Sequence, residues 1–473
     1  MPTNKPLLEG PIIKSLLRLA IPIVIANILQ AAYNLVDAFW VGRLGGAAVA
    51  AVSVSTPATF FTIALGTGLA IAGSILIAQY FGAGNKPMVN HIAAQTLLMV
   101  ALVSILLGAT GYILSPFFLK LLNVSPEVYN GALGFMRVSF IGLVFNFSFF
   151  VFQAIMRGVG NATISVYIVL GTVILNFALD PLFIFGWGPF PAAGVKGAAI
   201  ATVFTQSIAA VTGFVILFRG KFSIHLRKHD FRPDWKYVRK AFVIGFPASI
   251  EQSMRALGLV LMTFLIASFG TITMASYGAG SNLLQFIMIP AMGLSMSIST
   301  LAGQNIGAGN ISRAAQIGKL GSLLGFTILT FLGIICYLLA SQLVAFFVPG
   351  DSDVIHGGAT FLRIMCLSWG FIGLQLCLTG VLRASGNMIT AMILTLISQW
   401  VLQFPLAYVL SRHTALAERG IWFAFPVSYI IIALITMAVY ARGDWKKKRL
   451  TNEDEKLTEE ISKEILLDEG MQK

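Results

Sequence analysis

The sequence predicts an all-α integral membrane protein, with twelve transmembrane helices arranged as two pseudo-symmetric six-helix lobes. Three observations support this prediction. Apolar residues make up 57% of the 473 residues, charged residues only 11%, and the mean hydropathy is +0.84. Apolar runs of roughly 20 or more residues recur along the chain, which is the length that a helix needs to cross a bilayer. Short motifs of the first half also return in the second half at a nearly constant spacing.

Glycine, proline and charged residues divide the chain into twelve candidate spans. The first apolar run follows Lys5, Lys14 and Arg18, as in a signal peptide, but no small-residue cleavage site ends a short apolar segment. We therefore interpret this run as a retained first span. The predicted spans lie near 15–41, 47–79, 90–115, 131–156, 163–186, 194–218, 241–268, 273–303, 314–340, 358–382, 388–410 and 418–441.

The distribution of lysine and arginine predicts the orientation of the chain. Twelve spans place both termini on one side, and most basic residues lie on that side, above all in 219–240 and 446–449. Because cytoplasmic loops carry the excess of lysine and arginine, we expect an integral plasma (inner) membrane protein with both termini in the cytoplasm. The net charge is +13. Basic residues that flank apolar helices suit anionic headgroups, so membrane lipids and not nucleic acid are the expected partners.

Several motifs recur between the two halves of the chain. The sequence AQYFGAGN at 78–85 recurs as GQNIGAGN at 303–310, and RGVGN at 157–161 recurs as RASGN at 383–387. The GAGN motifs follow predicted helices and lack the lysine of a phosphate-binding loop, so we interpret them as tight turns. Nearly the same spacing pairs Pro22 with Pro247, Arg137 with Arg363 and Gly194 with Gly420.

This repeat predicts the two-lobed plan of a transporter. Each half holds six spans, and because six is even the halves share their topology and are related by an axis along the membrane normal, with a central cleft between them. The basic segment between the halves is expected to be a flexible tether. The expected parts are an N-lobe at 1–218, a cytoplasmic basic linker at 219–240, a C-lobe at 241–441 and a charged cytoplasmic tail at 442–473.

The tail after the last span is polar, with Leu457, Ile461 and Ile465 at a spacing of four residues. This spacing is compatible with a short amphipathic helix on the membrane surface. The alternative is a solubilised tail without a specific role.

The stretch YNLVDAFWVG at 33–42 places an aspartate near the end of an otherwise uncharged, mostly apolar span. A carboxylate at mid-membrane costs at least ~2.5–3.5 kcal/mol on insertion scales, so Asp37 is a functional candidate by default. Gln30, Tyr33 and Asn34 precede it by two turns and one turn and lie on the same helix face. A polar stripe on a membrane helix faces a cavity or a partner helix. The alternative is a hydrogen-bond network that only holds helices together.

Asp180 lies in LNFALDPLF of the fifth predicted span, one turn after Asn176 and two turns after Thr172. The following Pro181 cannot donate a backbone hydrogen bond, so it frees a carbonyl group in the preceding turn. Carboxylate, amide, hydroxyl and carbonyl oxygens are the ligands that a hard cation or a transported proton requires. The alternative is an interfacial aspartate near the outer membrane surface.

Glu251, in FPASIEQSMR of the seventh predicted span, has two open interpretations. Arg255 follows at i+4 in the favourable order, so the pair could neutralise itself. Alternatively, Glu251 and Arg255 line the substrate cleft, for which Gln30 and Asn34 are further candidates. The repeat places apolar residues opposite all three intramembrane acids, and both aspartates belong to the first lobe. We therefore expect the cation site in the first lobe.

These features resemble the multidrug and toxic compound extrusion (MATE) family of secondary transporters, over residues 10–441. The shared features are the twelve spans, the repeat of six and six, Pro22 followed by Asp37, and the paired glycine-containing turns. LDPLFIFG around Asp180 looks like the DinF-like branch of this family, in which an aspartate of the fifth helix joins one of the first.

For that branch the resemblance implies a site for H⁺ or Na⁺ in the N-lobe. Carried over to this sequence, the site consists of Tyr33, Asp37, Asn176 and Asp180, and Asp37, Asn176 and Asp180 are the candidate ligands for Na⁺. A threonine of the sixth helix completes the site in the family, and Thr202 in GAAIATVF is the candidate here.

The chain departs from the NorM-like branch in its second half. The tenth predicted span, 358–382, has no acidic residue, and Arg255 stands where the seventh-helix glutamate of that branch is expected. A cation site in the C-lobe is therefore not expected.

The expected function is antiport: export of organic cations or amphipathic drugs driven by inward H⁺ or Na⁺, without a catalytic residue or a cofactor. Aromatic and methionine side chains suit bulky apolar cations. A flippase for lipid-linked oligosaccharides, a function of other branches of the superfamily, would instead favour basic residues along the cleft; Arg137, Arg255 and Arg363 are the candidates. An aspartyl protease is disfavoured because the Gly-x-Gly-Asp motif is absent, and an ion channel is a further alternative. A monomer suffices for this plan.

Overall fold

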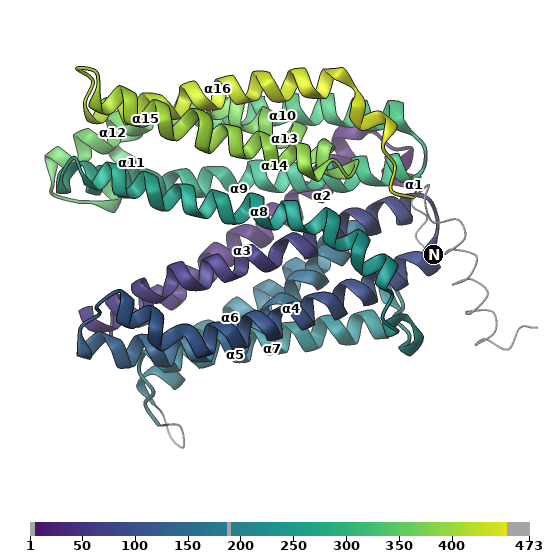
Figure 1. Cartoon of the computed structure of the whole chain (residues 1–473), viewed down its shortest axis with the longest axis horizontal. Helices are drawn as coiled ribbons and strands as arrows, with labels where there is room; N and C mark the ends of the chain where they lie inside the picture. The colour runs from purple at the N-terminus through teal and green to yellow at the C-terminus, as the bar shows by residue number, and fades with distance from the viewer. Residues whose placement is uncertain (1–4, 187–190, 452–473) are drawn as a thin grey trace, which may run out of the picture. The chain divides into compact units, whose positions relative to one another are not determined.

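The computed structural model describes residues 5–186 and 191–451, and the regular structure of this part of the chain is helical (Figure 1). The tail pattern at Leu457, Ile461 and Ile465 lies outside the described residues. The helices are α1 (Lys5–Leu8), α2 (Ile12–Gly42), α3 (Gly46–Gly82), α4 (Lys86–Leu121), α5 (Pro126–Gly158), α6 (Thr163–Phe185), α7 (Val195–Phe218), η1 (Lys221–Ser223), η2 (Lys228–Phe231), α8 (Trp235–Ala267), α9 (Thr271–Gly307), α10 (Ile311–Leu338), α11 (Ala340–Phe347), α12 (Ser352–Cys366), α13 (Trp369–Ala384), α14 (Met388–Leu396), η3 (Ile397–Gln403), α15 (Phe404–Arg412), α16 (Glu418–Arg442) and η4 (Asp444–Lys447).

The helices confirm the predicted all-α membrane fold. In the described part of the chain, 11 helical segments are long and apolar enough to cross a membrane, with α14, η3 and α15 counted as one segment. α12 and α13 meet at a bend of 51° and together form a twelfth candidate. Each predicted span therefore coincides with a helix or with this bent pair.

Both GAGN motifs are tight turns that end equivalent helices. Gly84 follows α3 with φ +77°, and Gly309 follows α9 with φ +81°, a conformation that glycine adopts without steric cost. The next residues, Asn85 and Asn310, each donate a backbone hydrogen bond to the carbonyl five positions earlier, at 3.0 and 2.8 Å. The two halves thus share backbone geometry as well as sequence at these turns.

One predicted pairing within the repeat, Gly194 with Gly420, is wrong. Gly194 precedes α7 with φ 55° and ψ −135°, and the residue with matching angles before α16 is Ala417, with φ 48° and ψ −127°. Gly420 lies inside α16 against the backbone at the end of α15, as Gly197 lies against the end of α6. The loop before α16 is shorter than the loop before α7, which shifts the register of the repeat at this point.

The chain consists of two compact units, and the boundaries between them fall inside helices α2 and α8. The N-terminal unit contains Ile25–Ser249, and the C-terminal unit contains Ile250–Leu450 with the chain up to Val24. Each break closely follows a proline, Pro22 or Pro247, which removes a helix hydrogen bond. The predicted lobes group whole transmembrane helices and so differ from these units. Their bounds at 1–218 and 241–441 stay a prediction.

In each unit, a serine hydroxyl group bonds a helix segment on one side of such a boundary to another helix of the same unit. In the N-terminal unit, Ser249 Oγ donates to the carbonyl of Leu65 at 2.6 Å. In the C-terminal unit, Ser297 Oγ donates to the carbonyl of Leu16 at 2.9 Å. Side-chain hydroxyl groups that bond backbone carbonyls of another helix fix helices together in an apolar environment.

The linker is a folded segment in place of the expected flexible tether. α4 presents His91 and Gln95 on one face, one turn apart. The amide nitrogen of Gln95 donates to the carbonyls of Asp230 and Arg232 at 2.8 and 2.5 Å, and its oxygen accepts from the N–H of Asp234 at 3.2 Å. His91 Nε2 lies 3.0 Å from Asp234 Oδ2. These bonds satisfy backbone groups that a mobile tether would leave to water.

Candidate functional site

A cavity of about 450 Å³ opens within the N-terminal unit, between α2, α3, α5 and α7. Gln30, Tyr33, Asn34 and Asp37 all line it, so the polar stripe of α2 faces this cavity. Within the described residues, no lysine or arginine lines it. The remaining wall consists of Ala38, Val41, Val49, Val52, Ser53, Thr56, Thr59, Phe60, Ile63, Phe135, Ser139, Gly142, Leu143, Asn146, Ala198, Ala199, Thr202, Val203 and Gln206.

Asp37 lies half-buried at the wall of this cavity, bonded to α7. Thr202 Oγ1 donates a hydrogen bond to Asp37 Oδ2 at 3.2 Å. Thr202, named from the resemblance, is therefore in contact with Asp37.

Asp180 lies behind Asp37 on α6, fully buried together with Asn176. Asn176 Nδ2 donates to Asp180 Oδ1 at 3.0 Å, across one turn of the helix. Pro181 lies inside α6 and donates no hydrogen bond to the carbonyl of Phe177. A carboxylate, an amide and a freed carbonyl thus lie close together on one helix.

The carboxyl groups of Asp37 and Asp180 are close enough to interact electrostatically with each other, and Asn176 lies beside them. Asp37 Oδ1, Asp180 Oδ2 and the Asn176 side-chain oxygen are buried and accept no hydrogen bond from any residue that the structure describes. Two neighbouring carboxylates repel each other unless a proton or a cation lies between them. Three oxygen atoms without donors fit a hard cation such as Na⁺ or a shared proton.

Aromatic packing fixes α2 against α6 next to the two aspartates. The ring of Trp40 lies 5.8 Å from that of Phe177 and 6.2 Å from that of Phe185, measured between centroids. The guanidinium of Arg43 lies 5.1 Å from the Trp40 ring. This cluster lies one turn beyond Asp37 along α2.

Tyr33 bonds a residue that the sequence analysis did not select. Its hydroxyl group lies 2.6 Å from Thr205 Oγ1, one turn after Thr202 on α7. Both Tyr33 and Thr205 are buried. The spacing of the two threonines in ATVFT placed both on one helix face and could have identified Thr205.

Glu251 lies in the C-terminal unit, 1% exposed, within a charged cluster. Arg255 Nη2 donates to Glu251 Oε1 at 3.2 Å, and Thr395 Oγ1 donates to the same oxygen at 3.0 Å. Arg383, which the sequence analysis did not select, forms a second ion pair with this carboxylate. Glu251 therefore has two cationic partners, and Gln399 Nε2 adds a bond to the Arg255 carbonyl at 3.1 Å.

The other arginines considered for a flippase lie elsewhere. The Arg137 guanidinium stacks over the Tyr112 ring, 4.8 Å from its centroid. Arg363 Nη2 donates to Ser341 Oγ at 3.3 Å. Neither side chain lines the cavity of the N-terminal unit.

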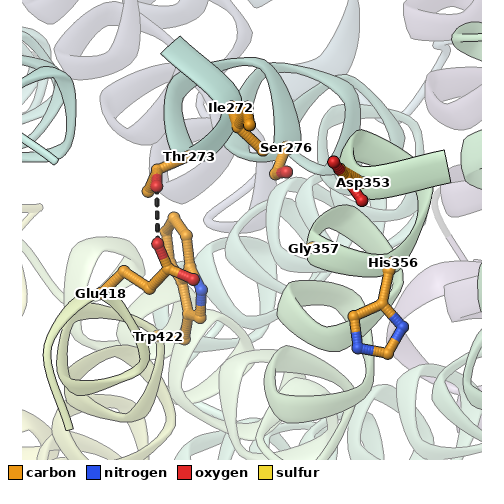
Figure 2. Close-up of a pocket in the computed structure, with 8 residues that line it drawn as sticks. All are labelled: Ile272, Thr273, Ser276, Asp353, His356, Gly357, Glu418 and Trp422. Atoms are coloured by element: carbon orange, nitrogen blue, oxygen red, sulfur yellow. Dashed lines mark hydrogen bonds between the residues drawn. The ribbon is translucent and has the colours of Figure 1, made fainter. Parts of the chain in front are cut away.

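A second pocket, of about 320 Å³, lies in the C-terminal unit where α9, α12 and α16 begin (Figure 2). Asp353 and Glu418 are first-turn residues of α12 and α16, where negative side chains stabilise a helix N-terminus. Thr273 Oγ1 donates to Glu418 Oε2 at 2.6 Å (Figure 2). His356 completes the polar wall. The helix N-termini and the Thr273 hydrogen bond stabilise Asp353 and Glu418, so the presence of these two carboxylates does not require a bound ligand.

Metal sites built from three or more histidine, cysteine, aspartate or glutamate side chains are absent from the described part of the chain. The oxygen cluster at Asp37, Asn176 and Asp180 contains two carboxylates and one amide, which is a ligand set for a weakly bound alkali cation and not for a transition metal.

Comparison with known proteins assigns the family. The model of the MatE family matches residues 22–182 and 247–409, more than half of the chain and once in each half. The chain belongs to the MATE family of transporters. It is accordingly an integral membrane transporter and not an enzyme, as the sequence predicted, and the all-α two-repeat fold is that of this family.

Relatives of similar length cover nearly the whole of this MATE transporter. The probable multidrug resistance protein YoeA of Bacillus subtilis is 28% identical over 91% of this chain and 94% of its own length. The probable multidrug resistance protein NorM of Thermotoga maritima is 28% identical, with 96% of each chain covered. A solved outward-facing MATE multidrug transporter of the MOP superfamily has the same fold, with a TM-score of 0.86 and 24% identity over 94% of this chain and 99% of its own.

Proposed function

We propose that this MATE transporter is a secondary active antiporter that exports organic cations or amphipathic drugs in exchange for H⁺ or Na⁺. The observation that carries the proposal is the pair of neighbouring carboxyl groups, Asp37 and Asp180, beside a cavity within the N-terminal unit. The printed names of the relatives, which include multidrug resistance proteins, support the class of substrate. The pairing of Asp37 with Asp180 supports the DinF-like branch.

The coupling ion binds at the oxygen atoms that lack donors. Asp37 lies at the cavity wall, and Asp180 with Asn176 lies buried behind it, so an ion that enters from the cavity reaches Asp37 first. Bound H⁺ or Na⁺ removes the repulsion between the two carboxylates and lets α2 move toward α6.

Besides α2 and α6, the bound ion also affects α7, because two hydrogen bonds one turn apart connect α2 to α7. Thr202 donates to Asp37, and Tyr33 bonds Thr205 one turn away. A change in the charge at Asp37 therefore changes a contact between α2 and α7, both of which line the cavity. A drug that prefers the cavity shape of the ion-free form is thereby coupled to the ion without sharing its ligands.

The cavity wall suits amphipathic cations. Phe60, Phe135 and Leu143 provide apolar and aromatic contacts, while Gln30 and Asn34 provide polar ones. Asp37 supplies the one carboxylate among the described lining residues.

A lipid-linked oligosaccharide flippase is less well supported. Recognition of a pyrophosphate group requires basic side chains in the cavity, and the described lining residues include none. We further propose an inner-membrane location with both termini in the cytoplasm, on the basis of the distribution of lysine and arginine. The proposed transporter acts as a monomer and without a cofactor.

Efflux from proteoliposomes under separately imposed pH and Na⁺ gradients tests this function. A fluorescent organic cation is loaded, and its transport is followed with a pH gradient alone, a Na⁺ gradient alone, or neither. We expect transport to be faster with at least one of the gradients than with neither. Transport that continues at the same rate when both gradients are collapsed would contradict antiport.

A further inference from the structure

A groove in the C-terminal unit is lined by two lysines, Lys319 and Lys446, whereas the described lining of the N-terminal cavity has no basic residue. α13 packs against both α10 and α16, and residues of all three helices line a groove of about 440 Å³. Residues of α10, spaced three and four positions apart, form one wall: Ser312, Ala315, Gln316, Lys319 and Ser322. This spacing places them on one helix face.

Polarity changes along the groove. Ser312 and Gln316 lie near the start of α10, and Lys446 lies in η4 just after the end of α16, so this end is polar and basic. Leu374 and Leu378 of α13 add apolar surface further from this end, next to the aliphatic part of Lys319 and to Ser322 on α10. The groove extends over about ten residues of α10, which at 1.5 Å per residue is roughly 15 Å, the depth of one leaflet.

The wall formed by α16 is held in place by its own contacts. Tyr440 donates its hydroxyl hydrogen to the carbonyl of Ala315 at 3.0 Å. The Tyr440 ring stacks on the Trp445 ring with 5.2 Å between centroids, and Lys446 Nζ lies 5.9 Å from the Trp445 ring. The groove is therefore formed by packed residues and requires no rearrangement to accept a ligand.

Two lysines of the groove have charges that no carboxylate balances within the described residues. Lys319 and Lys446 are both exposed, and neither takes part in an ion pair in that part of the chain. The neighbouring Lys447, which does not line the groove, pairs with Asp444 at 4.0 Å. A lysine stem lies along apolar surface while its ammonium group extends to the headgroup level.

We propose that this groove binds an anionic phospholipid of the cytoplasmic leaflet. The ammonium groups of Lys319 and Lys446 bind the phosphate of the headgroup, and an acyl chain lies along Leu374, Leu378 and Met437. The proposal depends on the predicted cytoplasmic position of the α10 start and the α16 end, but not on the transported substrate or the coupling ion. A zwitterionic lipid would place its choline group against two lysines, which the charge of the groove disfavours.

Lipid retention by the purified full chain tests the proposal. The protein is reconstituted in nanodiscs of phosphatidylcholine with graded phosphatidylglycerol, released in the mass spectrometer under native conditions, and its bound lipids are identified. We expect wild-type protein to retain phosphatidylglycerol in preference to phosphatidylcholine. The variant Lys319→Gln with Lys446→Gln should lose this selectivity by roughly 10- to 30-fold, from about 1 kcal/mol per lysine.

A matched variant, Lys447→Gln with Lys448→Gln, removes the same charge beside the groove and should keep the selectivity. A third variant, Gln316→Trp, keeps both lysines but fills the groove, and it should also lose the lipid. Equal retention by all four proteins would overturn the proposal, because neither the two lysines nor the groove would then determine which lipid is bound. Equal loss in the matched variant would also overturn it, because the selectivity would then reflect surface charge alone. Loss on filling the groove without loss on removing the lysines would show a site for any lipid and would also overturn it.

Discussion

The two units of this transporter carry buried charge in opposite balance. In the N-terminal unit, Asp37 and Asp180 lie close enough to interact electrostatically, and each keeps a buried oxygen without a donor among the described residues. In the C-terminal unit, Glu251 receives hydrogen bonds from Arg255, Arg383 and Thr395 on a single oxygen. The first arrangement has an excess of negative charge within its spans, and the second has an excess of positive charge.

This difference is the basis for the proposed coupling in the N-terminal unit. In that proposal, a proton or Na⁺ bound between the two carboxylates removes their repulsion, and its binding therefore shifts the conformation of the surrounding helices. Glu251 is already neutralised, and a cation gains little there because two guanidinium groups repel it. The duplication kept the prolines and the glycine turns in both halves but not this chemistry, so coupling is expected in one unit only.

The largest expected effect is the loss of coupling in the N-terminal unit. We predict that Asp37→Asn and Asp180→Asn each insert and fold normally yet lose gradient-driven export to the level of empty liposomes. Asparagine keeps the size of the side chain but can neither bind nor release the proton, and it binds a cation more weakly. Efflux from cells and thermal unfolding of the purified variants measure the two halves of this prediction.

Glu127→Gln is the matched control, because Glu127 is an exposed carboxylate at the start of α5. It should export at the wild-type rate. Normal export by both aspartate variants at matched expression would remove the basis for a coupling site in the N-terminal unit.

The next effect concerns stability in the C-terminal unit. Glu251→Gln leaves Arg255 and Arg383 without their shared carboxylate, and we predict a loss of roughly 3–5 kcal/mol in the free energy of unfolding. Replacing all three residues together, with Glu251→Leu, Arg255→Met and Arg383→Met, should restore most of that stability. Thermal unfolding and efflux are measured on the same preparations.

The triple variant distinguishes the two interpretations of Glu251 that the sequence left open. If the cluster only holds α8, α13 and α14 together, a stable triple variant exports cations. A stable triple variant that fails to export would instead assign Glu251 or its arginines to substrate binding. Wild-type stability of Glu251→Gln alone would show that the cluster is not structural.

The sequence predicted contacts that depend on helical spacing. Gln30, Tyr33, Asn34 and Asp37 were placed on one face by their spacing, and they line one cavity. The Glu251–Arg255 pair follows from the same i, i+4 geometry. Periodicity within a helix is local, so it is available before the fold is known.

Contacts between distant segments were not predictable in this way. Arg383 reaches Glu251 from another helix, 132 residues away, and Gln95 binds the linker carbonyls from α4, 135 and 137 residues away. No periodic pattern links such residues, because only tertiary packing brings them together. Thr202 was named from the resemblance to a family, since its distance along the chain from Asp37 carries no signal of its own.

A smaller effect compares two threonines, one in each unit, that donate a hydrogen bond to a carboxylate. Thr202 donates to Asp37 at 3.2 Å, and Thr395 donates to Glu251 at 3.0 Å. A hydrogen bond to a charged group is worth about 1.5–3 kcal/mol, so we predict that Thr202→Val alters the apparent affinity for the coupling ion by roughly tenfold or more. Thr395→Val should lower the unfolding temperature but leave that affinity unchanged. Ion titrations of efflux measure both, and equal shifts in the two variants would mean that the units do not differ in ion binding.

The smallest expected effect is the contribution of Asp234 to stability. This carboxylate lies outside the membrane spans and serves as a reference for the buried carboxylates of both units. A hydrogen bond from His91 lowers the pKa of Asp234 below its ordinary value, with further help from the backbone N–H groups of Tyr237 and Lys236. Because the pKa in the folded protein is depressed, ionised Asp234 stabilises the fold above the ordinary pKa of about 4, and this stability is lost as the pH falls through the folded pKa. We predict that Asp234→Asn costs roughly 0.5–1.5 kcal/mol at neutral pH and progressively less below about pH 4. Thermal unfolding of wild type and variant across this pH range is the measurement, and a difference that grows on acidification would contradict the assigned role of the His91 contact.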